Sequence, residues 1–105
     1  MGGLRLIIIS KSLRDSARGQ DCTLRLAGIC NFNPETTVLC HLPCGQKGMG
    51  MKSPDNIACF GCSACHDVID GRAKGEYSVL DLLRAMAETQ LIWIRMGLMV
   101  IKGAA

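Results

Sequence analysis

Seven cysteines in a chain of 105 residues constrain its fold more than any other feature. Their number is odd and no secretory signal pattern precedes them, which disfavours a framework of paired disulfides. Cys62 and Cys65 are separated by two residues and followed directly by His66. This spacing lets two thiolates bind one metal ion through a tight turn. The cysteines therefore predict metal ligation in a reducing cytosol, where zinc adds the stability that a small core lacks.

A zinc ion held by Cys62 and Cys65 needs two further ligands. Cys22 and Cys30 are the natural candidates, because a strand-like segment followed by a turn at Gly28 can return one thiolate to the other. We therefore predict a structural zinc site made by these four cysteines. Four thiolates close a tetrahedral coordination sphere, so this site leaves no position for a substrate.

Other uses of the cysteines remain open from the sequence. Cys40, His41, Cys44 or Cys59 could replace one member of the set, and free cysteines also occur as small buried apolar residues. The run Cys59, Cys62, Cys65 allows an iron–sulfur cluster, but it lacks the fourth cysteine of the bacterial pattern.

Charge permits nucleic-acid binding without arguing for it. The formal net charge is +3, and four thiolates with one zinc ion would reduce it to about +1. The contacts we predict are therefore local: Lys47 and Lys52 in a glycine-rich segment without acids, Arg18 in a short basic helix, and Arg72 after a second helix. An aromatic content of 4% disfavours a stacking platform for single strands.

The pattern of the chain predicts an α+β domain over residues 11–105, preceded by an extension over 1–10. We expect a helix over 13–18 capped by Ser12, a second helix capped by Ser63 and stopped at Gly71, and a third over 76–98. Strands are expected over 22–26, 35–42 and 55–60. In the long C-terminal helix one apolar face contains Leu80, Leu83, Ala87, Leu91, Ile94 and Leu98, and it is broadened by Val79, Leu82, Met86 and Trp93. No segment reads as a membrane span, and we expect a cytoplasmic protein.

The two histidines lie at the two ends of the predicted strand, loop, strand and helix unit. His41 lies near the end of one predicted strand, and His66 lies on the helix that the zinc site fixes. A glycine-rich loop and the pair Asp55-Asn56 separate them. Strand, loop, strand and helix with a histidine at each end is the ββα-metal arrangement.

These residues carry a resemblance to a known family. His41-Leu42, then Asp55-Asn56-Ile57, then the run from Cys62 to His66 resemble an HNH endonuclease motif in a treble-clef zinc setting. The segments 13–19 and 62–72 are similar to the phage and prophage YbcO-type nucleases, relatives of the phage Ref nuclease. The resemblance covers about residues 11–72.

The resemblance implies a DNA endonuclease in the cytoplasm of a bacterial host. His41 would be the general base that activates water, since histidine titrates near neutrality. His66 would ligate one catalytic divalent ion (Mg²⁺, Mn²⁺ or Zn²⁺), and Asp55 would support that ion or hold the loop. Asn56 would orient the base or the loop between the strands. DNA is the implied partner, with a recombinase filament as a second one.

Two other functions fit the same sequence. A treble-clef module that binds nucleic acid or a recombination protein without cutting needs the four zinc ligands but does not need His41. A zinc-stabilised interaction protein would instead dock a partner on the helix over 76–98. The sequence leaves the oligomeric state open.

Overall fold

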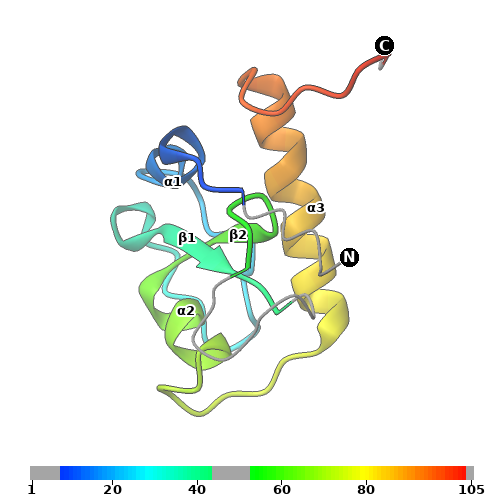
Figure 1. Cartoon of the computed structure of the whole chain (residues 1–105). Helices are drawn as coiled ribbons and strands as arrows, with labels where there is room; N and C mark the ends of the chain where they lie inside the picture. The colour runs from blue at the N-terminus through cyan, green and yellow to red at the C-terminus, as the bar shows by residue number, and fades with distance from the viewer. Residues whose placement is uncertain (1–7, 44–52, 104–105) are drawn as a thin grey trace.

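The computed structural model describes residues 8–43 and 53–103 and shows a small α+β structure with a long C-terminal helix (Figure 1). In chain order, its elements are α1 (Lys11–Ser16), the 3₁₀ helix η1 (Pro34–Thr36), β1 (Val38–His41), β2 (Ala58–Gly61), α2 (Ser63–Ile69) and α3 (Val79–Arg95). The predicted α+β class and the long last helix are confirmed. None of the helices in the described part of the chain is long and apolar enough to cross a membrane.

The strands β1 and β2 form an antiparallel hairpin around which the rest is arranged. Val38 pairs with Gly61, and His41 pairs with Ala58 at the other end. All four residues of β2 are buried, because α3 covers this strand. Gly61 packs directly on the Cys40 sulfur, which leaves no space for a Cβ atom there.

A buried polar contact fixes α3 on the hairpin. Thr89 is fully buried, and its hydroxyl lies 2.9 Å from the Thr23 hydroxyl and accepts a hydrogen bond from the Phe60 N–H. One turn further along, the Trp93 ring meets Phe60 edge-on at a centroid distance of 5.9 Å. The Trp93 indole N–H donates to the Ser16 hydroxyl at 2.7 Å. The polar and aromatic contacts of Thr89 and Trp93 therefore connect α3 to both β2 and α1.

The face of α3 that packs on the hairpin differs from the apolar face that the spacing picks out. Leu82, Ala85, Thr89 and Trp93 are buried. Leu80, Leu83, Ala87, Leu91, Ile94 and Leu98 are all exposed. The helix therefore has two apolar faces, and the more leucine-rich one faces outward.

Several local predictions need correction. The segment 22–26 is not a strand, because Arg25 adopts a left-handed backbone conformation (φ 40°) and only Thr23 pairs with the Phe60 carbonyl. The N-cap of α1 is Ser10 rather than Ser12, and Cys62 rather than Ser63 caps α2. The expected extension over 1–10 is tied in at its end, since the Asp55 N–H donates to the Ile8 carbonyl.

Candidate functional site

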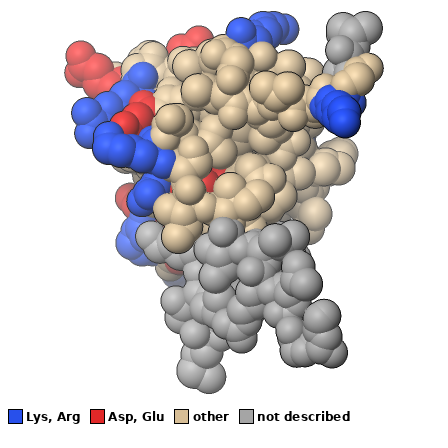
Figure 2. Space-filling view, turned by 45° about the horizontal axis from the view of Figure 1, so that its top comes forward, with Lys and Arg blue, Asp and Glu red and all other residues tan. Residues whose placement is uncertain are grey.

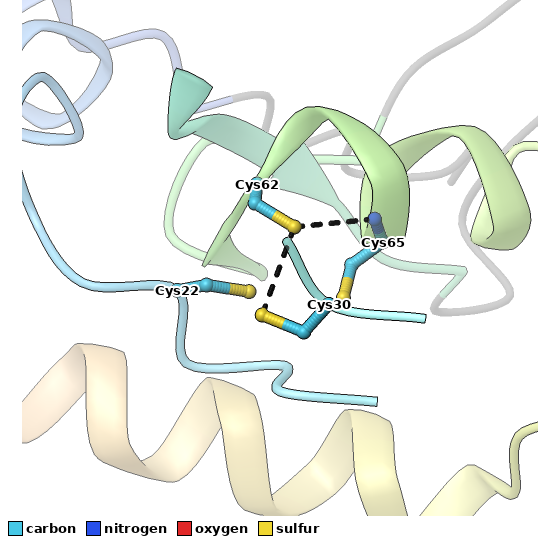
Figure 3. Close-up of side chains that lie close together, drawn as sticks. All are labelled: Cys22, Cys30, Cys62 and Cys65. Carbon is cyan, nitrogen blue, oxygen red and sulfur yellow. Dashed lines mark hydrogen bonds between the residues drawn. The ribbon is translucent and has the colours of Figure 1, made fainter. Parts of the chain in front are cut away.

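The structure brings Cys22, Cys30, Cys62 and Cys65 together, and their four sulfur atoms all lie within 4.8 Å of one another. Figure 3 shows the four side chains pointing toward a common centre. Four sulfurs bound about 2.3 Å from one zinc ion would lie roughly 3.8 Å apart in a tetrahedron. The Cys30 and Cys62 sulfurs are 3.8 Å apart. The cluster can therefore hold a metal ion such as zinc with little rearrangement.

Backbone N–H groups surround three of these sulfurs. The Arg25 N–H lies 3.4 Å from the Cys22 sulfur, and the Phe32 N–H lies 3.4 Å from the Cys30 sulfur. Both residues have positive φ angles, which turn these N–H groups toward the cluster. N–H donors favour the thiolate form that metal ligands require.

Cys62 receives the most donors. Burial alone would raise its pKa, but the backbone N–H groups of Cys65 and Asn31 outweigh burial and lower the pKa to about 7. At Cys30 burial dominates and raises the pKa to about 11. Without a cation, the four thiolates therefore do not all form near neutral pH. A bound divalent cation supplies the missing positive charge.

The remaining cysteines lie outside the cluster or outside the described residues. Cys40 and Cys59 face each other across the hairpin and are fully buried. The neighbouring Cys59 thiol and burial both raise the pKa of Cys40, so it stays a protonated thiol. Cys44 lies outside the described residues. The iron–sulfur alternative gains no support, because Cys59 is not part of the cluster.

His41 and His66 line one open cleft of about 610 Å³. His41 comes from the end of β1, and His66 comes from α2. Arg14, Arg18 and Arg72 line the same cleft. Two histidines and three guanidinium groups therefore share a single cavity next to the cysteine cluster.

The His41 ring is held by a buried carboxylate. Its Nε2 lies 2.7 Å from Oδ1 of Asp55, whose side chain is 8% exposed. The other oxygen of Asp55 accepts from the Ser10 N–H at 2.6 Å and lies 3.2 Å from Arg14 Nε. Burial alone would raise the pKa of Asp55, but the hydrogen bonds from His41 and Ser10 outweigh it and lower the pKa. An ionised Asp55 thus fixes Nε2 as the protonated ring nitrogen and leaves Nδ1 with the lone pair.

His66 has a separate carboxylate partner one helical turn away. Its Nε2 lies 3.0 Å from Oδ2 of Asp70. Arg72 completes the group, with Nη1 at 2.9 Å from Asp70 and Nε at 3.0 Å from Asp67. In the described part of the chain, only the cysteine cluster brings three or more histidine, cysteine or acidic ligands close enough for one ion. His66 and Asp70 thus form a pair of potential ligands.

Asn56 lies in the turn before β2 and contacts α3 rather than His41. Its backbone carbonyl accepts a hydrogen bond from the Gln90 amide at 2.9 Å. Its buried side-chain oxygen has no hydrogen-bond partner among the described residues. Lys47 and Lys52, the predicted backbone contacts of the loop, lie outside the described residues.

Arg14 and Asp70 line the cleft and were not among the predicted site residues. Arg14 stands on the exposed side of α1, and nothing in the local sequence marks it, because its partner Asp55 is 41 positions away. Asp70 follows His66 by four residues, which places both on one helical face. That spacing is the signal by which Asp70 can be found from sequence.

Basic side chains gather along one edge of the molecule. Figure 2 shows lysines and arginines, with acidic residues between them, on the left, which is the side where α1 and α2 lie in Figure 1. The face turned toward the viewer is largely uncharged. This charged edge is therefore on the side of α1 and α2, the helices that carry Arg14 and His66.

Comparison with known proteins gives one consistent family. A family model described as "Putative nuclease YbcO" matches residues 11–98. Two curated proteins with that description, from Escherichia coli (strain K12) and from Enterobacteria phage 82, are each 48% identical to this chain over 89 residues. In each case, the match covers 81% of this chain and 93% of the relative.

A solved structure is similar as well. It is described as a "putative bacteriophage protein from Escherichia coli str. K-12 substr. MG1655" and superposes with a TM-score of 0.66 at 42% identity. The match covers 82% of this chain and 100% of that one.

Proposed function

This chain belongs to the YbcO family of phage-associated proteins named as nucleases, and we propose that it is a metal-dependent DNA endonuclease of the HNH type. The observation that carries the proposal is the cleft that His41 and His66 share with three arginines. The succession β1, β2, α2, with one histidine at the end of β1 and the other in α2, supports a ββα-metal centre.

His41 is the proposed general base. Asp55 binds the Nε2 side of its ring, which leaves Nδ1 to accept a proton from the attacking water. In this proposal Asp55 positions His41, which differs from the support of the catalytic ion that the resemblance implied. Asn56 holds the turn between the strands through its bond to Gln90.

The cleft arginines are the proposed phosphate contacts. Arg18 and Arg72 were predicted from the sequence, and Arg14 joins them. A guanidinium binds a phosphate through paired N–H donors, which suits the DNA backbone. Contacts of this kind position DNA without reading its sequence.

His66 and Asp70 are the proposed protein ligands of a catalytic divalent ion. His66 and Asp70 offer one nitrogen and one oxygen ligand 3.0 Å apart, and water and phosphate oxygens would complete the sphere. A mixed nitrogen and oxygen set suits Mn²⁺ or Zn²⁺ as well as Mg²⁺. Such an ion would stabilise the charge that develops on the phosphate and on the leaving oxygen.

The cysteine cluster has a structural role in this proposal. Zinc with four thiolates has no open position, so all bond cleavage belongs to the histidine cleft. The cluster fixes the start of α2, on which His66 lies directly after Cys65.

The test is the nicking of supercoiled and single-stranded DNA by the wild type and His41→Ala with Mg²⁺, Mn²⁺ or Zn²⁺. Loss of a general base costs about 10²- to 10⁴-fold, so cleavage should nearly vanish, while the zinc content stays at the wild-type value. The protein should remain folded, with a lower melting temperature because Asp55 loses its His41 partner. A His66→Ala variant should also lose cleavage and regain part of it in excess metal ion. A recombinase filament is included as an activator.

Equal behaviour of the wild type and His41→Ala under every condition would reject the nuclease. The same DNA retained by both proteins would then identify a binding module that holds nucleic acid without cutting it.

A further inference from the structure

The outward face of α3 is an apolar stripe that is exposed in the described structure. Leu80 is 70% exposed, Leu83 is 55% exposed and Leu91 is 57% exposed. Ala87 and Ile94 lie on the same stripe and are also exposed. Figure 1 shows the other helices and strands all on one side of α3. Monomeric proteins rarely leave so many large apolar side chains in one row facing water.

The stripe is symmetric about its middle residue. Leu83 and Leu91 lie four residues to either side of Ala87, and Leu80 and Ile94 lie seven residues to either side. A two-fold interface places one patch against itself, so the patch must match its own reversed copy. An antiparallel pair of α3 helices meets that condition when the two-fold axis passes at Ala87.

We propose that this stripe binds a second copy of the same chain through antiparallel α3 helices. In this pair Leu83 of each copy packs on Leu91 of the other, and Leu80 packs on Ile94. Ala87 stands at the crossing point, where its small side chain allows the two helices to approach to about 8–10 Å.

Charge favours this occupant. Antiparallel helices oppose their dipoles, and the basic last turn with Arg95 lies beside the first turn of the other copy, which carries Asp81.

The first experiment measures mass in solution by light scattering on the zinc-loaded full-length protein. The wild type should show twice the chain mass of 11.3 kDa. Leu83→Glu and Leu91→Lys should each raise the dimer dissociation constant by at least ~100-fold, since an isologous interface receives every substitution twice. Mixing the two variants should restore a dimer, because the new carboxylate of one chain faces the new ammonium of the other.

The matched control is Ile9→Glu. Ile9 is 72% exposed and lies outside α3, so this variant should remain dimeric. Zinc content and melting temperature are measured for each variant, and both should stay close to wild-type values because Leu83, Leu91 and Ile9 are exposed in the described structure.

A second experiment tests the position of the axis. Ala87→Cys should form a covalent dimer under mild oxidation, since each new thiol meets its own counterpart at the two-fold axis. Leu80→Cys should not, because its counterpart lies about 21 Å away along the helices. Wild-type protein shows how far the native cysteines contribute.

A wild type that stays monomeric at high micromolar concentration would overturn the proposal and leave the stripe to a different protein. A dimer that survives Leu83→Glu, or a cross-link at Leu80→Cys equal to that at Ala87→Cys, would overturn it as well. None of these outcomes depends on the histidine cleft, so the dimer proposal and the nuclease proposal are tested independently.

Discussion

The cysteine cluster and the histidine cleft lie next to each other but are built on opposite principles. The four sulfurs are drawn from segments far apart in the chain, and backbone N–H groups at Arg25, Asn31, Phe32 and Cys65 cover three of them. The two histidines instead pair with the side chains of Asp55 and Asp70 in an open cavity. A metal ion bound by the cluster would be surrounded by backbone N–H groups and buried sulfurs, whereas a ligand bound in the open cleft can exchange with solvent. This contrast separates a site that holds the fold from a site that can act on a substrate.

The largest effect is expected at the cluster. Cys62→Ser should lose both bound zinc and cooperative unfolding, because zinc binding contributes on the order of 10 kcal/mol, comparable to the entire stability of a small domain. Metal analysis and thermal melting measure both quantities. Removing zinc from the wild type with a strong chelator should have the same effect.

Cys59→Ala is the matched control for the cluster. Cys59 is equally buried but lies outside the four ligands, so its loss should cost about 1–2 kcal/mol in packing and leave about one zinc ion per chain. Equal loss of zinc in both variants would place the metal elsewhere.

A smaller effect is expected where the cleft depends on Asp55. Asp55→Asn should lower the free energy of unfolding at pH 7 by about 1–3 kcal/mol, because the charged acceptor of His41, Ser10 and Arg14 is lost. Its folded-state pKa is lowered, so its stabilisation is present above the unfolded value near 3.9. The difference between the two proteins should shrink as the pH falls through the folded-state pKa.

Urea unfolding at several pH values measures this difference. The bound zinc is kept in place by restricting the series to pH values at which metal analysis still finds it. A stability gap that grows toward acid pH would contradict the assignment of Asp55 as an ionised acceptor.

The smallest effect is expected at the rim of the cleft. Arg18→Gln should weaken DNA binding uniformly across sequences and reduce the slope of log K against log salt by about one, since one phosphate contact is lost. Lys74→Gln removes the same charge from an exposed position outside the cleft and should leave the slope unchanged. Equal slopes for the two variants would place the DNA elsewhere.

The sequence predicted the cysteine cluster because its signal is local. The spacing between Cys62 and Cys65 limits the backbone to a turn, and a turn brings two sulfurs together whatever the rest of the chain does. The hairpin and the place of His41 at its edge also followed from the short β-favouring runs. The conformation of the segment 22–26 did not follow from its alternating pattern. The left-handed backbone at Arg25 turns its N–H toward the Cys22 sulfur, and a strand would not place it there.

The bonding of Asp55 and the buried face of α3 depend on long-range contacts. Asp55 contacts Ser10 and Arg14, which are more than forty residues away in the sequence. The periodicity of the sequence does not predict contacts at such a separation. In α3 the buried face includes Thr89, which looks out of place on an apolar face until Thr23 and the Phe60 N–H supply its partners. The leucine-rich stripe has the stronger hydrophobic pattern, yet its side chains are exposed to solvent in the described structure.

Helix α2 carries two cysteine ligands at its beginning and His66 and Asp70 farther along it, all within one short helix. Each residue of an α-helix turns the chain by about 100°, so one residue inserted after Cys65 would swing His66 and Asp70 a quarter-turn or more away from the cleft. The exposed Ser63 of α2 is open to replacement, but the number of residues between Cys62 and Asp70 is not. Transfer of this centre to another scaffold would therefore depend first on the length of α2 and only then on the identity of its other residues.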